Sequence, residues 1–216
     1  MKILALTDIH GSYDKAEEII KREIADVLVI GGDLTTVGTV KEADSAIKRF
    51  QRYTAQVFCV AGNMDLPQHD DLFMQLGVSI NGQGRVVDNV GFFGVSASPH
   101  SPLHTPYELS EEEISKRIQV GFSEVDHCEI KIFVPHVPPF GTKVDIVHAG
   151  YHVGSSAVRE FIENEQPHVV ICGHIHEARG QDSIDKSMIV NCGQASNGFF
   201  AVIQISDEIQ IMTHKL

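Results

Sequence analysis

Short runs of apolar residues recur along the chain and are its clearest structural signal. They are rich in Val, Ile and Phe, and most of them do not alternate between apolar and polar positions. Such runs are typical of strands buried on both faces of a layered α/β structure, whereas half-buried strands alternate. The runs predict strands at residues 3–6, 27–30, 57–60, 92–95, 130–134, 169–172, 188–190 and 199–205.

Between these runs, apolar residues repeat at spacings of three and four, which predicts helices with one buried face. Ser110 and Glu113 form a capping-box pattern ahead of the third helix, and Ser155 or Ser156 can cap the fourth. Roughly the last 30 residues contain strands joined by tight turns. Together these elements predict a mixed α/β sandwich with outer helices. The helical patterns cover residues 16–24, 43–50, 114–118 and 158–162.

Composition and length are those of one globular domain. The chain has 216 residues, of which 43% are hydrophobic and 21% are charged, so we expect a single domain over residues 1–216. Residues 96–106 contain three prolines and predict a long surface loop. No apolar run approaches ~18 residues, so we expect no membrane span. The first residues lack a signal-peptide pattern, which favours a cytoplasmic location.

The formal net charge of −12 restricts the partners of the chain. A generally acidic surface repels phosphate backbones, so we expect no binding to duplex nucleic acid. The charge does not exclude a small anionic substrate, because bound metal ions would reverse the local sign. The oligomeric state does not follow from the sequence.

Polar residues able to bind metal ions come directly after five of the predicted strands. In open α/β sheets, ligands bind beyond the carboxyl ends of the strands, so we expect these residues to meet in one crevice. Glycines stand beside nearly all of them and would let the backbone turn sharply. The candidate ligands are Asp8 and His10 after the first strand, Asp33 after the second, Asn63 after the third, His136 after the fifth, and His174 and His176 after the sixth.

The spacing and chemistry of these residues favour a metal site. In Asp8-x-His10 and His174-x-His176, the two side chains of each pair point the same way if the backbone is extended, and each pair could clasp one ion. The mixture of carboxylate, imidazole and amide oxygen suits Mn, Fe, Zn, Ni or Co better than Cu(I) or Ca. Each group alone could be a turn residue or a helix cap, but five such groups in one chain rarely arise from turn chemistry alone.

The order of these groups resembles a known family. They occur in the family's order from residue 8 to residue 176, so the resemblance covers most of the chain. Residues 136–145, together with the glycine-rich stretch at 150–155, also resemble the small Icc-related phosphoesterases. The motifs similar to the five blocks of the calcineurin-like metallophosphoesterase superfamily are Asp8-x-His10, Gly32-Asp33, Gly62-Asn63-x-Asp65, His136 and Gly173-His174-x-His176.

The resemblance implies a fold, a metal centre and a reaction. The fold is an α/β structure, a four-layer α/β/β/α sandwich with two mixed sheets. Two divalent metal ions, with manganese favoured, hold a bridging hydroxide that attacks phosphorus in line with the leaving group. Together with the departure at Met64 and the glycine-rich segment around His152, the resemblance leads us to expect a small phosphodiester or activated phosphomonoester as substrate and Asp33, Asn63 and His152 as catalytic residues. The implied ligands are Asp8, His10 and His176 for one ion, Asn63, His136 and His174 for the other, and Asp33 as the bridge.

Met64 departs from the family pattern, which usually has a histidine there that contacts phosphate and assists the leaving group. Methionine cannot donate a proton, and general acid assistance is typically worth ~10²–10⁴-fold in rate. Either another group replaces the histidine, with water, His100, His104 and His152 as candidates, or the substrates need little assistance. His152 lies in a glycine-rich segment and could line the pocket, whereas a surface or capping role for His148 is at least as well supported.

A protein that uses the fold only as an interaction scaffold is the alternative to an enzyme. Met64 is the one feature that favours this alternative. The seven intact candidate ligand positions favour the enzyme, because a scaffold has no need to keep all of them. A metal-dependent amide or thioester hydrolase would use similar residues, but the order of the five blocks matches phosphoesterases.

Overall fold

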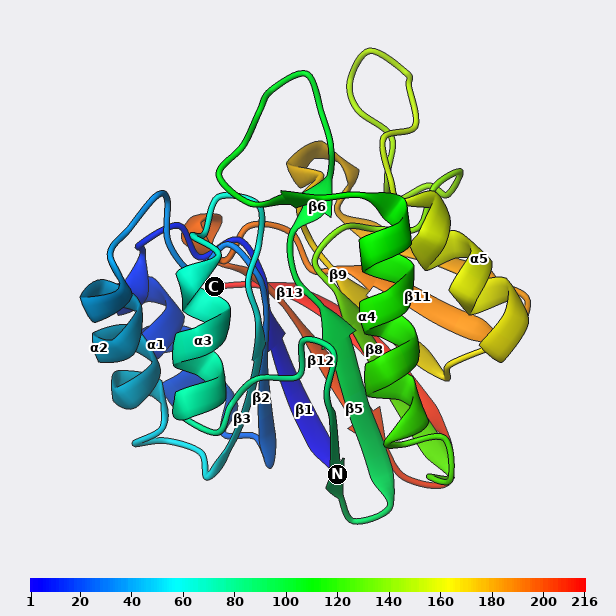
Figure 1. Cartoon of the computed structure of the whole chain (residues 1–216). Coiled ribbons are helices and arrows are strands. Elements are labelled where there is room, and N and C mark those ends of the chain that lie inside the picture. The colour runs from blue at the N-terminus through cyan, green and yellow to red at the C-terminus, as the bar shows by residue number, and fades with distance from the viewer.

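The central strands bury both of their faces, as their continuous apolar runs require. In the computed structural model, which describes residues 1–216, alternate residues of β1 (Lys2–Leu6) pack in opposite directions. Ile3 and Ala5 belong to the buried cluster between two sheets, whereas Leu4 and Leu6 belong to the cluster that includes the helix faces. Helices therefore form the outer layers and two sheets the inner ones (Figure 1), which confirms the predicted four-layer α/β/β/α sandwich.

The first sheet has five strands and is mixed. Its centre is β1, in which Ile3 lies opposite Val27 of a parallel neighbour and opposite Ile203 of an antiparallel one. This arrangement buries residues 3–6 of β1 within the sheet. In spatial order, the strands are β13 (Ile209–Lys215), β12 (Phe199–Ile205), β1, β2 (Val27–Gly31) and β3 (Gln56–Val60).

The second sheet has six strands and is also mixed. Its four inner strands are parallel to one another, and its two edge strands are antiparallel to their neighbours. The prediction of two mixed sheets is confirmed. In spatial order, the strands are β10 (Gly180–Ile184), β11 (Ser187–Asn191), β9 (Val169–Cys172), β8 (Ile130–Pro135), β5 (Val90–Val95) and β4 (Gly84–Val87).

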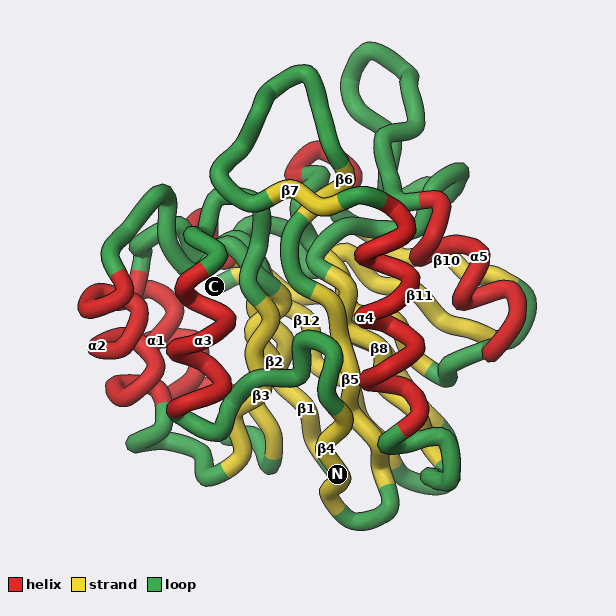
Figure 2. Tube along the Cα trace, viewed as in Figure 1, coloured by secondary structure: helices red, strands yellow, loops and turns green.

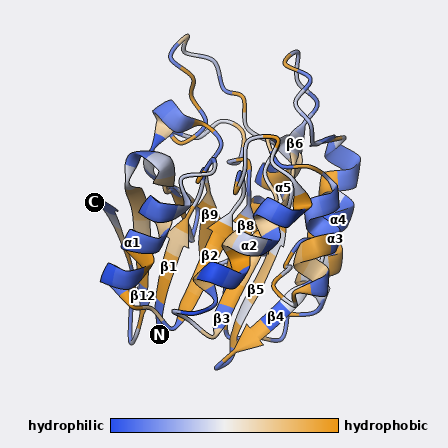
Figure 3. Ribbon diagram, turned by 90° about the vertical axis from the view of Figure 1, so that its left-hand side faces the viewer, coloured by the Kyte–Doolittle hydropathy of each residue, from blue (hydrophilic) through white to orange (hydrophobic).

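Five α-helices cover the outer faces of the sheets, three beside the first and two beside the second (Figure 2). Figure 3 shows hydrophobic strands in the interior and hydrophilic surfaces on the helices. Ser110 and Glu113 make both bonds of the predicted capping box, and Ser155 caps the last α-helix. No helix combines the length and the apolar content needed to span a bilayer. The helices are α1 (Tyr13–Glu23), α2 (Val40–Phe50), α3 (Gln68–Gln75), α4 (Glu111–Ser123), α5 (Ser156–Glu165) and the short 3₁₀ helices η1 (His176–Ala178) and η2 (Ala195–Asn197).

The structure differs from the predicted elements in a few places. The helix predicted over residues 16–24 ends at Glu23, and Ile24 is 77% exposed with a φ of 25°, because the chain turns there to enter β2. The predicted surface loop, residues 96–106, contains the short strand β6 (Ser98–Pro99), which pairs in parallel with β7 (Glu108–Leu109) just after the loop. Helix α3 and the edge strands β4 and β10 were not predicted.

The parallel strands of both sheets direct their carboxyl ends to the same end of the molecule, the upper end in Figure 1. The turns after β1, β2, β3, β8 and β9 meet there. Two longer segments, residues 98–109 and 136–155, stand over this end (Figure 1). The fold therefore brings the five predicted ligand-bearing segments into one region.

Candidate metal centre

Four of the candidate ligands have left-handed backbone conformations. The φ angles are 55° for Asp8, 47° for His10, 49° for Asp33 and 65° for His174. The prediction that the backbone is extended in the pairs Asp8/His10 and His174/His176 is therefore wrong. Sharp turns, and not the alternation of side chains along a strand, bring these side chains together. Backbone strain of this kind concentrates at functional sites, where the surroundings hold it in place.

Three glycines let other groups come close to the ligands. A Cβ atom on Gly32 would overlap the ring of His136, and one on Gly62 would overlap the carboxylate of Asp33. A Cβ atom on Gly173 would overlap the carboxylate of Asp8. The glycines of the sequence blocks are thus required by the close packing of the site.

One group of candidate ligands contains Asp8, His10 and His176, whose ligating atoms lie within 4.8 Å of one another. Nε2 of His176 is 3.3 Å from Oδ1 of Asp8 and 3.4 Å from Nε2 of His10. Metal bonds of ~2.0–2.2 Å place neighbouring ligand atoms roughly 3–3.5 Å apart. The spacing of these atoms therefore fits a single ion.

Asp33 lies between this group and a second one. Its Oδ2 atom is 3.6 Å from Nε2 of His10 and 3.6 Å from Nε2 of His136. Its Oδ1 atom accepts a hydrogen bond of 2.8 Å from the backbone N–H of Met64. One oxygen of Asp33 thus faces histidines of both groups, while the other is fixed by the backbone.

The second group contains Asn63, His136 and His174. Oδ1 of Asn63 is 3.0 Å from Nε2 of His136 and 2.8 Å from Nδ1 of His174. Nδ1 of His136 lies 2.9 Å from the carbonyl oxygen of Gly31, so a neutral ring carries its proton on Nδ1 and directs the lone pair of Nε2 at the Asn63 oxygen. Two facing lone pairs are the arrangement that a cation between them would stabilise, so these residues fit a metal ion.

The charges of the site also fit cations. Burial, reinforced by the nearby charges of Asp8 and Asp65, raises the pKa of Asp33 to about 7. Burial also opposes the ionisation of Asp8, but the hydrogen bond from His176 and the charges of the neighbouring histidines outweigh it and lower the pKa of Asp8 to about 2. Burial lowers the pKa of His174 to about 3, so its ring is neutral and able to coordinate. Divalent ions would offset the repulsion between these buried carboxylates.

Asp65 supports the site without belonging to either ligand group. Its buried carboxylate accepts hydrogen bonds from the backbone N–H groups of Gly62, Leu34 and Thr35 and from the hydroxyl group of Thr35. It therefore joins the turn after β2 to the turn after β3. This role was not predicted from the sequence, although an Asp in a glycine-containing segment is a turn signal.

Thr36 is a second supporting residue that the sequence did not reveal. Its hydroxyl oxygen is 2.9 Å from Nδ1 of His10, so it fixes the ring with Nε2 toward the other ligands. A single threonine in a turn does not indicate from the sequence that its hydroxyl group contacts a metal-ligand histidine. Only the fold shows which ring it contacts.

The predicted proton donors occupy different places. Nδ1 of His152 is 2.7 Å from Oδ1 of the buried Asp145, and its ring packs beside Phe140. A cleft of about 460 Å³ opens beside Asn63 and His174, and its lining includes His100 but not His152 or His104. The backbone N–H of the exposed His148 bonds to Glu177, in agreement with a surface role.

Comparison with known proteins identifies the family. Residues 1–178 match the family model of the calcineurin-like phosphoesterases. The chain belongs to this family. Its members use divalent metal ions to act on phosphate esters, and the structure assembles candidate ligands for such ions.

Individual relatives of this phosphoesterase agree with the assignment. The uncharacterized protein MJ1162 of Methanocaldococcus jannaschii is 35% identical over 195 residues, which cover 88% of this chain and 87% of that protein. The crystal structure of TT1561 of Thermus thermophilus has a TM-score of 0.77 and 16% identity, covering 99% of this chain and 98% of that chain. A dimetal phosphatase from Danio rerio has a TM-score of 0.67 and 13% identity, covering 100% and 96%. At these identities the two structures show a shared fold.

Proposed function

We propose that this protein hydrolyses small phosphate esters with a centre of two divalent metal ions, of which manganese is favoured. The observation that carries the proposal is the position of Asp33, whose Oδ2 atom is 3.6 Å from His10 and 3.6 Å from His136. A carboxylate oxygen in that position can bridge two ions. The proposed ligands are Asp8, His10 and His176 for one ion, Asn63, His136 and His174 for the other, and Asp33 for both.

The residues of the chain orient this centre. When bound, the two ions would supply a hydroxide nucleophile near neutral pH and counter the charge that develops on the phosphate oxygens. The Gly31 carbonyl oxygen fixes the ring of His136, and the Thr36 hydroxyl group fixes that of His10. The backbone N–H of Met64 fixes the carboxylate of Asp33. These contacts hold the ligands in place before an ion binds, which reduces the cost of reorganisation.

Both sheets are needed for the proposed centre. Turns that follow strands of the first sheet supply four ligands, which are Asp8, His10, Asp33 and Asn63. Turns that follow β8 and β9 of the second sheet supply His136, His174 and His176. Neither sheet holds a complete set of ligands for either ion. We therefore propose that residues 1–216 act as one domain.

The proposed substrates are phosphodiesters or activated phosphomonoesters. Met64 offers only its backbone N–H to the centre, so no proton donor stands where the family usually has a histidine. Esters with a good leaving group need the least assistance. His152 remains a predicted donor, held by Asp145, and His100 is a second candidate because it lines the cleft beside Asn63 and His174.

A panel of metals and esters tests the proposed function. The purified chain is loaded in turn with Mn, Ni, Co, Zn and Fe, and hydrolysis of bis-p-nitrophenyl phosphate and p-nitrophenyl phosphate is followed with each metal. We expect each chain to bind two ions and to hydrolyse the diester bis-p-nitrophenyl phosphate faster than the monoester p-nitrophenyl phosphate. Bound metal without turnover of any ester would favour the scaffold, and one ion per chain at saturating metal would exclude the dinuclear centre.

A further inference from the structure

The cleft beside the metal centre has a distinct chemical character. It measures about 460 Å³, which is within the range of small-molecule sites. It shares Asn63 and His174 with the candidate metal centre, so a phosphate group bound at the centre would have its organic part at the mouth of the cleft. The apolar part of its lining consists of Pro99, Pro102, Leu103, Val147, Val153 and Ile175.

No permanently charged side chain lines the cleft, and its only ionisable residues are the histidines His100 and His174. Its 13 lining residues include no Lys, Arg, Asp or Glu. The net charge of −12 adds no attraction for anions in the part of the cleft away from the metal ions. Away from the metal ions, a second phosphate or a carboxylate of the substrate would find only His100, whose ring already lies 3.7 Å from the carboxylate of Glu108. Desolvating such a group there would be costly.

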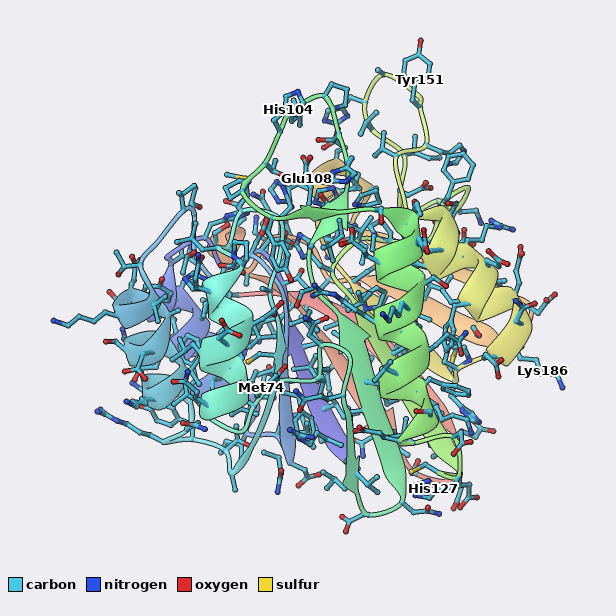
Figure 4. All side chains as sticks on the ribbon, in the orientation of Figure 1. Met74, His104, Glu108, His127, Tyr151 and Lys186 are labelled. Carbon is cyan, nitrogen blue, oxygen red and sulfur yellow. The ribbon has the colours of Figure 1, made fainter.

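The two walls of the cleft come from the segments that stand over the metal centre. Figure 4 shows His104 near the tip of one of these segments and Tyr151 near the tip of the other. Leu103 on one wall is 83% exposed and Val153 on the other is 41% exposed. Apolar side chains this exposed have apolar surface left to bury against a ligand.

A carboxylate holds each wall in shape. Glu108 accepts hydrogen bonds from the backbone N–H and hydroxyl groups of Ser101 and Thr105, two residues of the first wall. Asp145 accepts hydrogen bonds from the backbone N–H groups of Gly141 and Gly154 in the second wall. The cleft is thus preformed, so binding need not order either segment.

We propose that the organic part of the substrate is uncharged and largely apolar, and that it occupies this cleft while the phosphate group lies at the metal centre. The inference rests on the proposed function, because that function places the phosphate. It selects alkyl or aryl phosphate esters and disfavours substrates with a second anionic group. The continuity of the cleft with the ligands Asn63 and His174 identifies the occupant as part of the substrate rather than a separate partner.

A series of non-hydrolysable n-alkylphosphonates, from methyl to octyl, tests the proposal on the manganese-loaded chain of residues 1–216. Dissociation constants are measured by calorimetry, without turnover. We expect the affinity to rise about two- to fourfold per methylene until the cleft is filled, because each buried methylene favours transfer from water. A phosphonate that ends in a carboxylate should bind at least about tenfold more weakly than the alkylphosphonate of equal length.

Two isosteric variants localise the effect. Val153→Thr introduces a hydroxyl group into the cleft with little change of shape, whereas Val86→Thr makes the same change on the distant edge strand β4, where Val86 is 49% exposed. Val153→Thr should reduce the affinity for hexylphosphonate about threefold or more and leave that for methylphosphonate unchanged. Val86→Thr should change neither. Val153→Lys should bind the carboxylate-ended phosphonate more tightly than the alkylphosphonate of equal length, the reverse of the order expected for the wild-type protein.

The outcomes separate this proposal from the proposed function. If the protein hydrolyses esters but binds alkylphosphonates of every chain length with the same affinity, the proposal of an apolar substrate in the cleft is wrong and the proposed function is unaffected. If the affinity for alkylphosphonates rises with chain length but the protein hydrolyses no ester, the cleft binds apolar groups as proposed and the proposed function is wrong. If Val153→Thr changes the oligomeric state in light scattering and not the phosphonate affinities, the cleft is an interface between copies and the proposal is wrong.

Discussion

Among single residues, Asp33 differs from the other candidate ligands because its two oxygens have separate contacts. Asp33→Asn retains an oxygen to accept the Met64 N–H but removes the charge of the bridge. We expect kcat/KM to fall by about 10²–10³-fold, the scale for losing one preorganised electrostatic group, and the metal content to drop below two ions per chain. Steady-state kinetics and elemental analysis measure these effects.

A matched control exists for this substitution. Asp185 has a φ of 48°, close to the 49° of Asp33, but lies in an exposed turn. Asp185→Asn should leave kcat/KM and the metal content unchanged. Full activity of Asp33→Asn would contradict the bridging role.

Met64 determines how much the reaction depends on the leaving group. If nothing replaces the usual histidine, aryl esters should react fast and alkyl esters slowly. Met64→His retains the backbone N–H that orients Asp33 and adds a proton donor, so it should accelerate alkyl esters by up to ~10²-fold and aryl esters much less. The measurement is kcat/KM for both proteins over a series of esters with leaving groups of different pKa, after circular dichroism has shown that the variant is folded.

If kcat/KM of the wild-type protein does not depend on the pKa of the leaving group, another acid already protonates the leaving group. His100→Asn and His152→Asn in the same series would then identify it, because only the variant that lacks the donor should become sensitive to the leaving group. His100 lines the cleft, whereas His152 is bonded to Asp145. We therefore expect the larger effect from His100→Asn.

The identities of the candidate ligands could be predicted from the sequence, but their backbone conformations could not. Strand ends are visible as the ends of apolar runs, and Asp, Asn and His at those positions limit the possible chemistry. The left-handed conformations of Asp8 and His10 depend on bonds to distant segments, such as the bond from the backbone N–H of His10 to the carbonyl oxygen of Asp33. The contact between Thr36 and His10 depends on the fold in the same way.

At the scale of elements, the segment between β6 and β7 depends on Glu108. Burial opposes the ionisation of Glu108, but hydrogen bonds from Thr105 and Ser101 outweigh it and lower its pKa from 4.5 to about 2. A lowered acid pKa stabilises the folded state above pH 4.5, and this contribution is lost as the pH falls toward 2. Glu108→Gln should therefore lower the Tm near pH 7, and the difference from the wild-type protein should shrink below pH 4.5 and vanish near pH 2.

Thermal unfolding followed by circular dichroism measures this difference, with a chelator present so that metal binding does not vary with pH. Glu112→Gln on the exposed face of α4 is the matched control, because no hydrogen bond holds its side chain in a wall of the cleft. A Tm difference for Glu108→Gln that stays constant from pH 7 to pH 2 would contradict the assigned role.

Strands buried on both faces and helices with one apolar face are the elements that could be predicted. The strands β2 and β9 and residues 3–6 of β1 carry continuous apolar runs because they are covered on both faces, the run of β8 is interrupted only at Lys131, and each strand was predicted. The edge strand β10 has exposed polar residues at alternate positions, so it has no apolar run to detect. Helix α3 is only eight residues long and mixes buried and exposed polar groups, which weakens its periodicity.

At the scale of the whole molecule, the candidate ligands are divided between the two sheets. Four come from turns of the first sheet and the others from turns that follow β8 and β9. An ion held at this place would join the two halves of the sandwich. Its binding should therefore stabilise the global fold rather than a single loop, and the net charge of −12 favours the approach of cations.

Metal binding should consequently raise the Tm of the whole chain. An ion that binds only the folded state at 100 times its Kd contributes about 2.7 kcal/mol, and for a chain of this size each kcal/mol corresponds to ~2–4 °C. We expect Mn²⁺ to raise the Tm by roughly 5–10 °C per site over the value in chelator, in proportion to the logarithm of its concentration. His136→Gln should lose a large part of this increase, whereas His127→Gln, at an exposed position far from the centre (Figure 4), should retain it. Equal Tm values in saturating Mn²⁺ and in chelator would mean that the folded chain does not bind the metal, because selective binding to the folded state necessarily shifts the unfolding equilibrium.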